Sequence, residues 1–233
     1  MFKFVTMQAA PEFKPHSSAE LLLACQRIAG LTLGQLAAEL ALPVPDNLLK
    51  DKGWVGQLME QALGASAGSQ ALPDFPELGI ELKTLPINQQ GKPLESTYVC
   101  TAPLMGITGQ QWEDSWVCRK LSHVLWLPIL AERQLPLKDR IIGQGFLWQP
   151  DSEQQAELRQ DWEELMELIS LGGIAKIRGA HGKVLQLRPK AADSKALTRA
   201  VGVKGEPIQT LPRGFYLKSG FTQAILQQHF QLS

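Results

Sequence analysis

The sequence predicts a mixed α/β (α+β) fold, built as one domain of two lobes. The chain has 233 residues, which is enough for one large domain. Helix-capping patterns open the first part of the chain, and segments with alternating apolar residues follow them. No internal repeat or low-complexity linker divides the sequence. A mixed sheet flanked by helices is therefore the most economical architecture.

Three helices are expected in the first quarter of the chain. Ser17 and Glu20 have the spacing of a capping box in front of three leucines. Thr32 begins a second helix that runs to about Leu42, before a proline. A third helix is expected over about residues 53–63, since a glycine follows it.

Strand patterns follow these helices. Residues 79–86 and 96–101 read as two strands around a polar turn, which predicts an antiparallel hairpin. The apolar run 124–127 predicts another strand. Residues 175–178 and 184–187 flank a glycine-containing turn and predict a second hairpin.

Two further helices are expected near the end of the chain. Leu158, Trp162, Leu165 and Ile169 recur at helical spacing among acidic residues, so this segment predicts an amphipathic helix with an acidic outer face. Residues 221–230 predict a short C-terminal helix.

Charge is segregated along a chain whose formal net charge is zero. Residues 171–220 carry ten Lys or Arg against two acidic residues, and residues 151–170 carry seven acidic residues against one arginine. A basic block that also holds Phe215 and Tyr216 is typical of a surface that faces phosphate. A solvated face of scattered lysines is the alternative.

The cysteines and the apolar runs indicate a cytoplasmic protein without disulfides. Cys25, Cys100 and Cys118 are odd in number and have no metal-binding spacing. The N-terminus has no signal-peptide pattern, and no run approaches eighteen apolar residues.

Asp74, Glu81 and Lys83 form the strongest candidate site. Residues two apart on a strand point to the same face, so Glu81 and Lys83 project together and Leu82 turns into the core. Asp74 lies just before that strand and can bring a second carboxylate to the same point. Paired carboxylates bind a divalent cation through oxygen, and a nearby ammonium stabilises a charged transition state. This arrangement suits phosphodiester hydrolysis.

The acid-x-Lys pattern alone does not single out Glu81, because two other such triplets occur, at residues 12–14 and 193–195. Only the triplet at Glu81 lies on a predicted strand with an acid upstream. An ordinary Glu/Lys pair on a solvent-facing strand edge is the structural alternative.

Several separate segments, in the same order, resemble the MutH family of methyl-directed DNA mismatch-repair endonucleases. The resemblance begins near residue 17 and leaves residues 1–16 as an N-terminal segment without a match, ahead of a single MutH-like nuclease domain over residues 17–233. Its strongest stretches are residues 51–87, 92–99, 118–129, 161–169, 185–198 and 211–218.

The resemblance implies a restriction-endonuclease-like core, with two lobes that form a DNA-binding cleft. It implies Mg²⁺-dependent nicking of the unmethylated strand at hemimethylated GATC, 5′ to the guanine. Mn²⁺ or Ca²⁺ could substitute for Mg²⁺ in the site. It further implies activation by MutL, which mismatch-bound MutS recruits, and action as a monomer.

Residue by residue, the resemblance makes Asp74 and Glu81 metal ligands, Lys83 the catalytic lysine and Glu60 a further acidic residue of the active site. Lys120 matches an active-site lysine, although its neighbours WVCRK depart from the family's usual HVRHK. Further matches are implied to contact DNA, with Tyr216 sensing the adenine methyl group: Lys52, Glu95, Tyr98, Arg188, Pro189, Lys190 and Tyr216.

Two rival functions share these residues. A type II restriction enzyme would cut both strands at GATC and would dimerise on DNA. A catalytically silent reader of hemimethylated sites would bind DNA without cutting it. The complete set of Asp74, Glu81 and Lys83 favours an enzyme over the silent reader.

Overall fold

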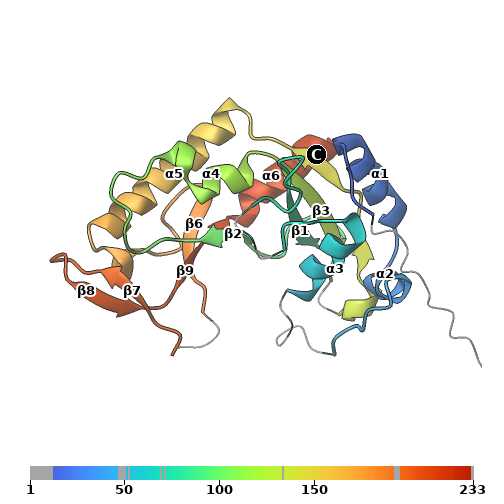
Figure 1. Ribbon diagram of the computed structural model, residues 1–233, viewed down its shortest axis with the longest axis horizontal. Helices are drawn as coiled ribbons and strands as arrows, with labels where there is room; N and C mark the ends of the chain where they lie inside the picture. Colours follow the sequence, from blue (N-terminus) through green and yellow to red (C-terminus); the bar gives the residue numbers. More distant parts are fainter. Residues whose placement is uncertain are drawn as a thin grey trace, which may run out of the picture.

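The computed structural model in Figure 1 is an arch, with one lobe on each side of an opening. It describes residues 13–46, 51, 53–68, 70, 72–132, 134–191 and 195–231. The N-terminal segment 1–16 therefore enters the structure only through residues 13–16. There the Lys14 ammonium lies 2.6 Å from a Glu77 carboxylate oxygen, which ties this end to the domain.

Six α-helices and nine strands make up the regular structure of the described residues. The helices are α1 (Ser18–Ile28), α2 (Leu33–Glu39), α3 (Trp54–Leu63), α4 (Trp116–Leu121), α5 (Ser152–Ser170) and α6 (Ser219–Phe230). The strands are β1 (Glu81–Ile87), β2 (Thr97–Thr101), β3 (Val124–Leu130), β4 (Ile141–Ile142), β5 (Phe146–Trp148), β6 (Leu185–Pro189), β7 (Thr198–Val201), β8 (Pro207–Thr210) and β9 (Arg213–Leu217).

Capping side chains fix the starts of the first helices as predicted. The Ser17 hydroxyl accepts a hydrogen bond from the Glu20 backbone N–H, which satisfies an orphan donor of α1. Thr32 and Gln35 form a reciprocal capping box at α2. This helix ends at Glu39, earlier than expected.

The predicted hairpin over residues 79–101 is wrong. Strand β1 pairs in parallel with β3, with Glu81 opposite Val124, while β4 and β5 pair antiparallel with β3. Strand β2 instead joins a second sheet of order β2-β9-β6. The polar segment between β1 and β2 is therefore a crossover between two sheets, because the fully apolar β3 offers β1 a better buried partner.

The second predicted hairpin is also wrong. Ile174–Lys176 forms a 3-10 helix, and β6 pairs with β9, with Leu185 opposite Leu217. Strands β7 and β8 form a separate two-stranded ribbon at the outer edge of one lobe (Figure 1).

The sheet around β3 lies between two hydrophobic cores. Leu125 and Leu127 belong to a core shared with α1, α2 and α3. Val124 and Trp126, which alternate with them, belong to a second core shared with α5, α6, β6 and β9. Strand β3 thus contributes side chains to both cores, as does β1 with Leu82 and Leu85.

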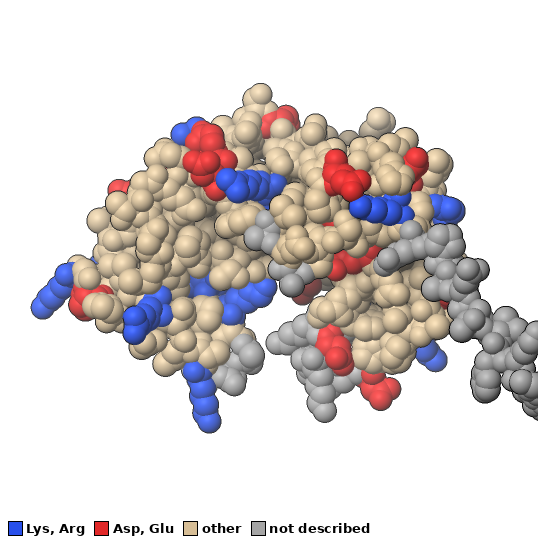
Figure 2. All heavy atoms as spheres, in the orientation of Figure 1, with Lys and Arg blue, Asp and Glu red and all other residues tan. Residues whose placement is uncertain are grey.

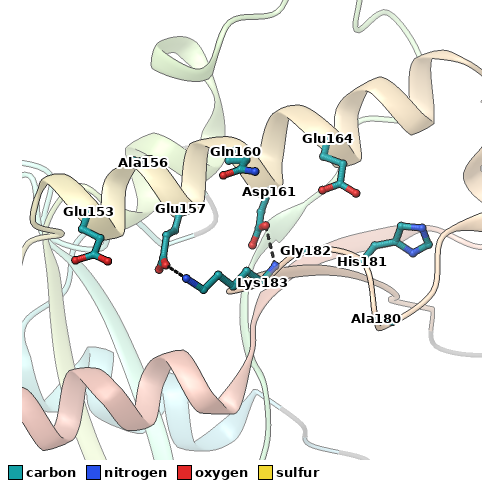
Figure 3. Close-up of a pocket in the computed structure, with 10 residues that line it drawn as sticks. All are labelled: Glu153, Ala156, Glu157, Gln160, Asp161, Glu164, Ala180, His181, Gly182 and Lys183. Atoms are coloured by element: carbon teal, nitrogen blue, oxygen red, sulfur yellow. Dashed lines mark hydrogen bonds and ion pairs between the residues drawn. The ribbon is translucent and has the colours of Figure 1, made fainter.

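Asp161 joins α5 to the start of β6 from the buried side of the helix, while Glu153, Glu163, Glu164 and Glu167 are exposed. Its carboxylate is 4% exposed and accepts backbone hydrogen bonds from Lys183, Val184 and Leu185 at 2.6–2.7 Å. Figure 3 shows Asp161 pointing from the helix toward this chain segment, beside an ion pair between Glu157 and Lys183. A buried carboxylate persists only with such partners.

The structure also gives the state of the cysteines and the character of the helices. All three cysteines are free thiols, and burial raises the pKa of Cys25 and of Cys100 to about 12. Within the described ranges, no helix combines the length and apolar character needed to cross a membrane.

Candidate active site and DNA-facing cleft

Glu81 begins β1 and lies between two lysines. Its carboxylate is 3% exposed, with one oxygen 2.5 Å from the Lys83 ammonium and the other 2.8 Å from the Lys120 ammonium. Glu81 and Lys83 therefore share a face, as the strand pattern predicts. The solvent-facing edge pair is excluded, because the carboxylate is buried.

Two further carboxylates, Asp74 and Glu60, are affected by the charge of Glu81. The Asp74 carboxylate accepts a hydrogen bond of 2.8 Å from the Leu82 backbone N–H, which fixes the preceding loop against β1. Burial, and then the negative charge of Glu81, raise the pKa of Asp74. Burial and repulsion by Asp74 and Glu81 likewise raise the pKa of Glu60 on α3. The negative charge of Glu81 thus disfavours ionisation of both Asp74 and Glu60.

Lys120 reaches this cluster from α4, which packs in the other core. Its ammonium also donates a hydrogen bond of 3.0 Å to the Leu72 carbonyl oxygen. The neighbouring Arg119 lies instead 5.4 Å from the Trp116 ring centre and is half-exposed. Trp116 and Arg119, which depart from the family's usual residues, thus contact each other, while the Lys120 ammonium contacts Glu81.

The cluster has the donor chemistry for a hard divalent cation. Asp74, Glu81 and Glu60 offer carboxylate oxygens, and their mutual repulsion would be relieved by a positive charge. Among the described residues, however, no three His, Cys, Asp or Glu side chains are already arranged around a common point that would hold a metal. The lysines supply the compensating charge for Glu81 here.

Aromatic and basic side chains form the facing wall. The rings of Tyr98 on β2 and Tyr216 on β9 meet edge to face, with centroids 5.3 Å apart. The Lys190 ammonium lies 2.9 Å from the Tyr98 ring centre, and the Arg188 guanidinium lies 5.6 Å from that of Tyr216. Cations over aromatic faces form a surface suited to bases and phosphates.

Three residues that support this wall carried no signal that singled them out in the sequence. Gly214 leaves room for the tyrosines, since a Cβ there would lie 2.9 Å from the Tyr98 ring. The Tyr98 hydroxyl shares a hydrogen bond of 3.0 Å with Thr101. Ser96 accepts a hydrogen bond of 2.6 Å from Arg188. Asp161, which lies outside this wall, does carry a signal in the sequence, because it is an acid among the apolar positions of its helix.

One cavity of about 500 Å³ brings both walls together. Figure 2 shows the molecule hollowed between its lobes, with Lys and Arg side chains gathered on the β7–β8 side of the opening. Lys52 lies outside the described residues. The cavity's lining includes Glu60, Lys83, Glu95, Ser96, Tyr98, Arg188, Pro189 and Tyr216.

The molecule combines a mixed sheet, an acid-x-Lys pair on one strand, an upstream aspartate and a basic aromatic cleft. Together these features define a nuclease of the restriction-endonuclease-like class. The family model described as "DNA mismatch repair enzyme MutH" matches residues 63–161.

Curated relatives match nearly the whole chain. A DNA mismatch repair protein MutH of Enterobacter sp. (strain 638) is 54% identical over 232 residues, covering 100% of this chain and 99% of the relative. Those of Serratia proteamaculans and Vibrio cholerae serotype O1 are 57% and 56% identical, each over 93% of this chain and over 95% and 98% of the relative. The chain belongs to the MutH family. The expected restriction-endonuclease-like fold and mismatch-repair endonuclease are thereby confirmed.

Proposed function

We propose that this endonuclease nicks the unmethylated strand of DNA at hemimethylated GATC sites, 5′ to the guanine. The observation that carries the proposal is the shared cavity, which has Glu60 and Lys83 on one wall and Arg188 and Tyr216 on the other. A sequence-specific nuclease must hold one phosphodiester at its carboxylates while it reads the adjacent bases. A single cleft with both kinds of side chain meets that requirement.

Asp74 and Glu81, with Glu60 beside them, are the proposed holders of Mg²⁺. Carboxylate oxygens are the ligands that this ion prefers. Burial, and then repulsion by the neighbouring carboxylates, raise the pKa values of Asp74 and Glu60, and a bound cation would relieve that repulsion. A bound ion would lower the pKa of water and neutralise charge on the phosphate.

Lys83 is the proposed catalytic lysine. Its ammonium lies on the same strand face as Glu81 and also lines the cavity, so it can contact both the carboxylate and a phosphate. In that place it can orient the attacking water or stabilise the charge that develops on the phosphoryl oxygens. Lys120 holds the second oxygen of Glu81 and thereby fixes that carboxylate.

The opposite wall is proposed to read the sequence. An arginine can pair with guanine O6 and N7 through two N–H groups, which is the role proposed for Arg188. Tyr216 would lie against the adenine methyl group, and Tyr98 would stack on a base. The remaining contacts are assigned to Lys52, Glu95, Pro189 and Lys190.

The basic block at residues 171–220 is proposed to bind the DNA backbone. The acidic helix α5 runs along the outside of the arch, away from the opening (Figure 1), as repulsion by phosphate requires. We further propose that the protein acts as a monomer, that MutL activates it and that MutS recruits MutL, as the family resemblance implies.

A nicking assay tests the proposal. Duplexes with one hemimethylated GATC and separately labelled strands are incubated with Mg²⁺ or with EDTA, with and without MutL. We expect cleavage of the unmethylated strand alone, only with Mg²⁺. Cleavage of both strands in one binding event would favour a restriction enzyme, and specific binding without cleavage would favour a silent reader.

A further inference from the structure

Arg188 is held by a residue for which neither the sequence nor the family match supplied a role. One terminal nitrogen of its guanidinium donates a hydrogen bond of 2.6 Å to the hydroxyl oxygen of Ser96. The guanidinium also lies 5.6 Å from the Tyr216 ring centre. Two independent contacts thus define the placement of an otherwise exposed side chain.

The strand register shows how far the side chain is redirected. The backbone of Arg188 lies opposite Gly214, at one end of the β2-β9-β6 sheet. Ser96 immediately precedes Thr97, which lies opposite Leu217 near the other end. The exposed side chain of Arg188 therefore extends along the cleft face of the sheet, over Tyr216 and toward Ser96.

Ser96 also ends the crossover that leaves the catalytic strand. Strand β1 carries Glu81 and Lys83, and the chain passes from it through the polar segment 88–96 to β2. The half-buried Ser96 lines the same cavity as Lys83 and Arg188. The hydrogen bond therefore connects the arginine to the segment that links the two sheets.

We infer that Ser96 is a positioning residue that orients Arg188 for guanine recognition. A guanidinium has five N–H groups in one plane, so the bond to Ser96 uses one and leaves the others for a base. An arginine held in place before DNA arrives loses less conformational entropy on binding. This inference rests on the proposed role of Arg188 in reading the sequence.

Ser96→Ala removes the hydroxyl, and Ser96→Thr keeps it. The measurement is the ratio of affinities for a GATC duplex and for a duplex in which that guanine is replaced, determined by competition with a fluorescent duplex in Ca²⁺ without Mg²⁺. We expect Ser96→Ala to lower this ratio about five- to tenfold, less than the full contribution of a hydrogen bond to a charged group, because the contact with the Tyr216 ring still orients the arginine. Ser96→Thr should restore most of the ratio.

A double-mutant cycle separates positioning from a general structural effect. In the Arg188→Ala background, Ser96→Ala should cause no further loss. Ser170→Ala, which removes an exposed serine hydroxyl from α5, is the matched control and should leave the ratio unchanged. Urea unfolding of each variant checks that the fold is retained.

The outcomes separate the role of Ser96 from the role of Arg188. If Arg188→Ala lowers the ratio and Ser96→Ala does not, the role of Ser96 is overturned. An equal effect of Ser96→Ala with and without Arg188 would overturn it too. If Arg188→Ala itself leaves the ratio unchanged, the proposed reading function of Arg188 fails first.

Discussion

Replacing Asp161 by asparagine should destabilise the protein by about 3 kcal/mol. The wild-type carboxylate accepts three backbone N–H groups, one on Oδ1 and two on Oδ2. An asparagine has a single acceptor oxygen. If that oxygen serves Val184 and Leu185, the amide NH₂ faces the N–H of Lys183, and two donors then meet.

The magnitude follows from these contacts. A hydrogen bond to a charged acceptor contributes about 1.5–3 kcal/mol, and an unsatisfied buried donor costs about 1–3 kcal/mol. The two remaining bonds lose their charge assistance and weaken further. Partial relaxation of the segment around Gly182 offsets some of this loss, so we expect about 3 kcal/mol in total.

Urea unfolding followed by tryptophan fluorescence measures this change, since Trp162 lies next to Asp161 and is buried. Glu164→Gln is the matched control, because it removes the same charge from an exposed position of α5. Glu164 and Asp161 both line the surface pocket between α5 and residues 180–183, which Figure 3 shows. A loss below about 0.5 kcal/mol for Asp161→Asn, the usual range for surface substitutions, would refute the anchoring role.

Three further predictions concern the cleft. Asp74→Asn should stabilise the protein by about 1 kcal/mol at pH 7. Since the pKa of Asp74 is raised in the folded protein, its ionisation lowers the stability of the wild type as pH rises. The greater stability of the variant in thermal unfolding should therefore vanish when the pH is below 3.8, the ordinary pKa of an aspartate. A stability difference that persists below that pH would contradict this cause. Gly214→Ala should displace the ring of Tyr98 and weaken DNA binding about tenfold, or 1.4 kcal/mol; unchanged anisotropy titrations would count against the tyrosine wall. For wild type, log affinity should fall by about 0.9 per neutralised phosphate for each tenfold rise in salt, and a flat salt dependence would exclude backbone binding by the basic block.

Local signals allowed five of the six α-helices of the described residues, all except α4, and the strand that carries Glu81 and Lys83 to be predicted. Caps at Ser17 and Thr32 mark helix starts because only neighbouring backbone groups are involved. The side-by-side placement of Glu81 and Lys83 follows from the two-residue period of any strand. These features depend on residues close together in the sequence, and the structure confirms them.

The strand pairings could not be predicted in the same way. Strand β1 pairs with β3, and β2 pairs with β9, across long stretches of chain. A polar turn between two strands is compatible with a hairpin and with a crossover, and burial of β3 on both faces decides between them. The hydrogen bond of Ser96 to Arg188 depends on this pairing and was equally hidden.

DNA binding and cleavage by Glu81→Gln, measured in parallel with wild type on a hemimethylated GATC duplex, show whether the cluster around Glu81 is the active site. The variant removes one negative charge between Lys83 and Lys120, so affinity should be retained or increased. Cleavage should fall by at least about a thousandfold, as expected when a residue acts on the reacting centre. Cleavage at the wild-type rate by a correctly folded Glu81→Gln protein would contradict the assignment of this cluster as the active site.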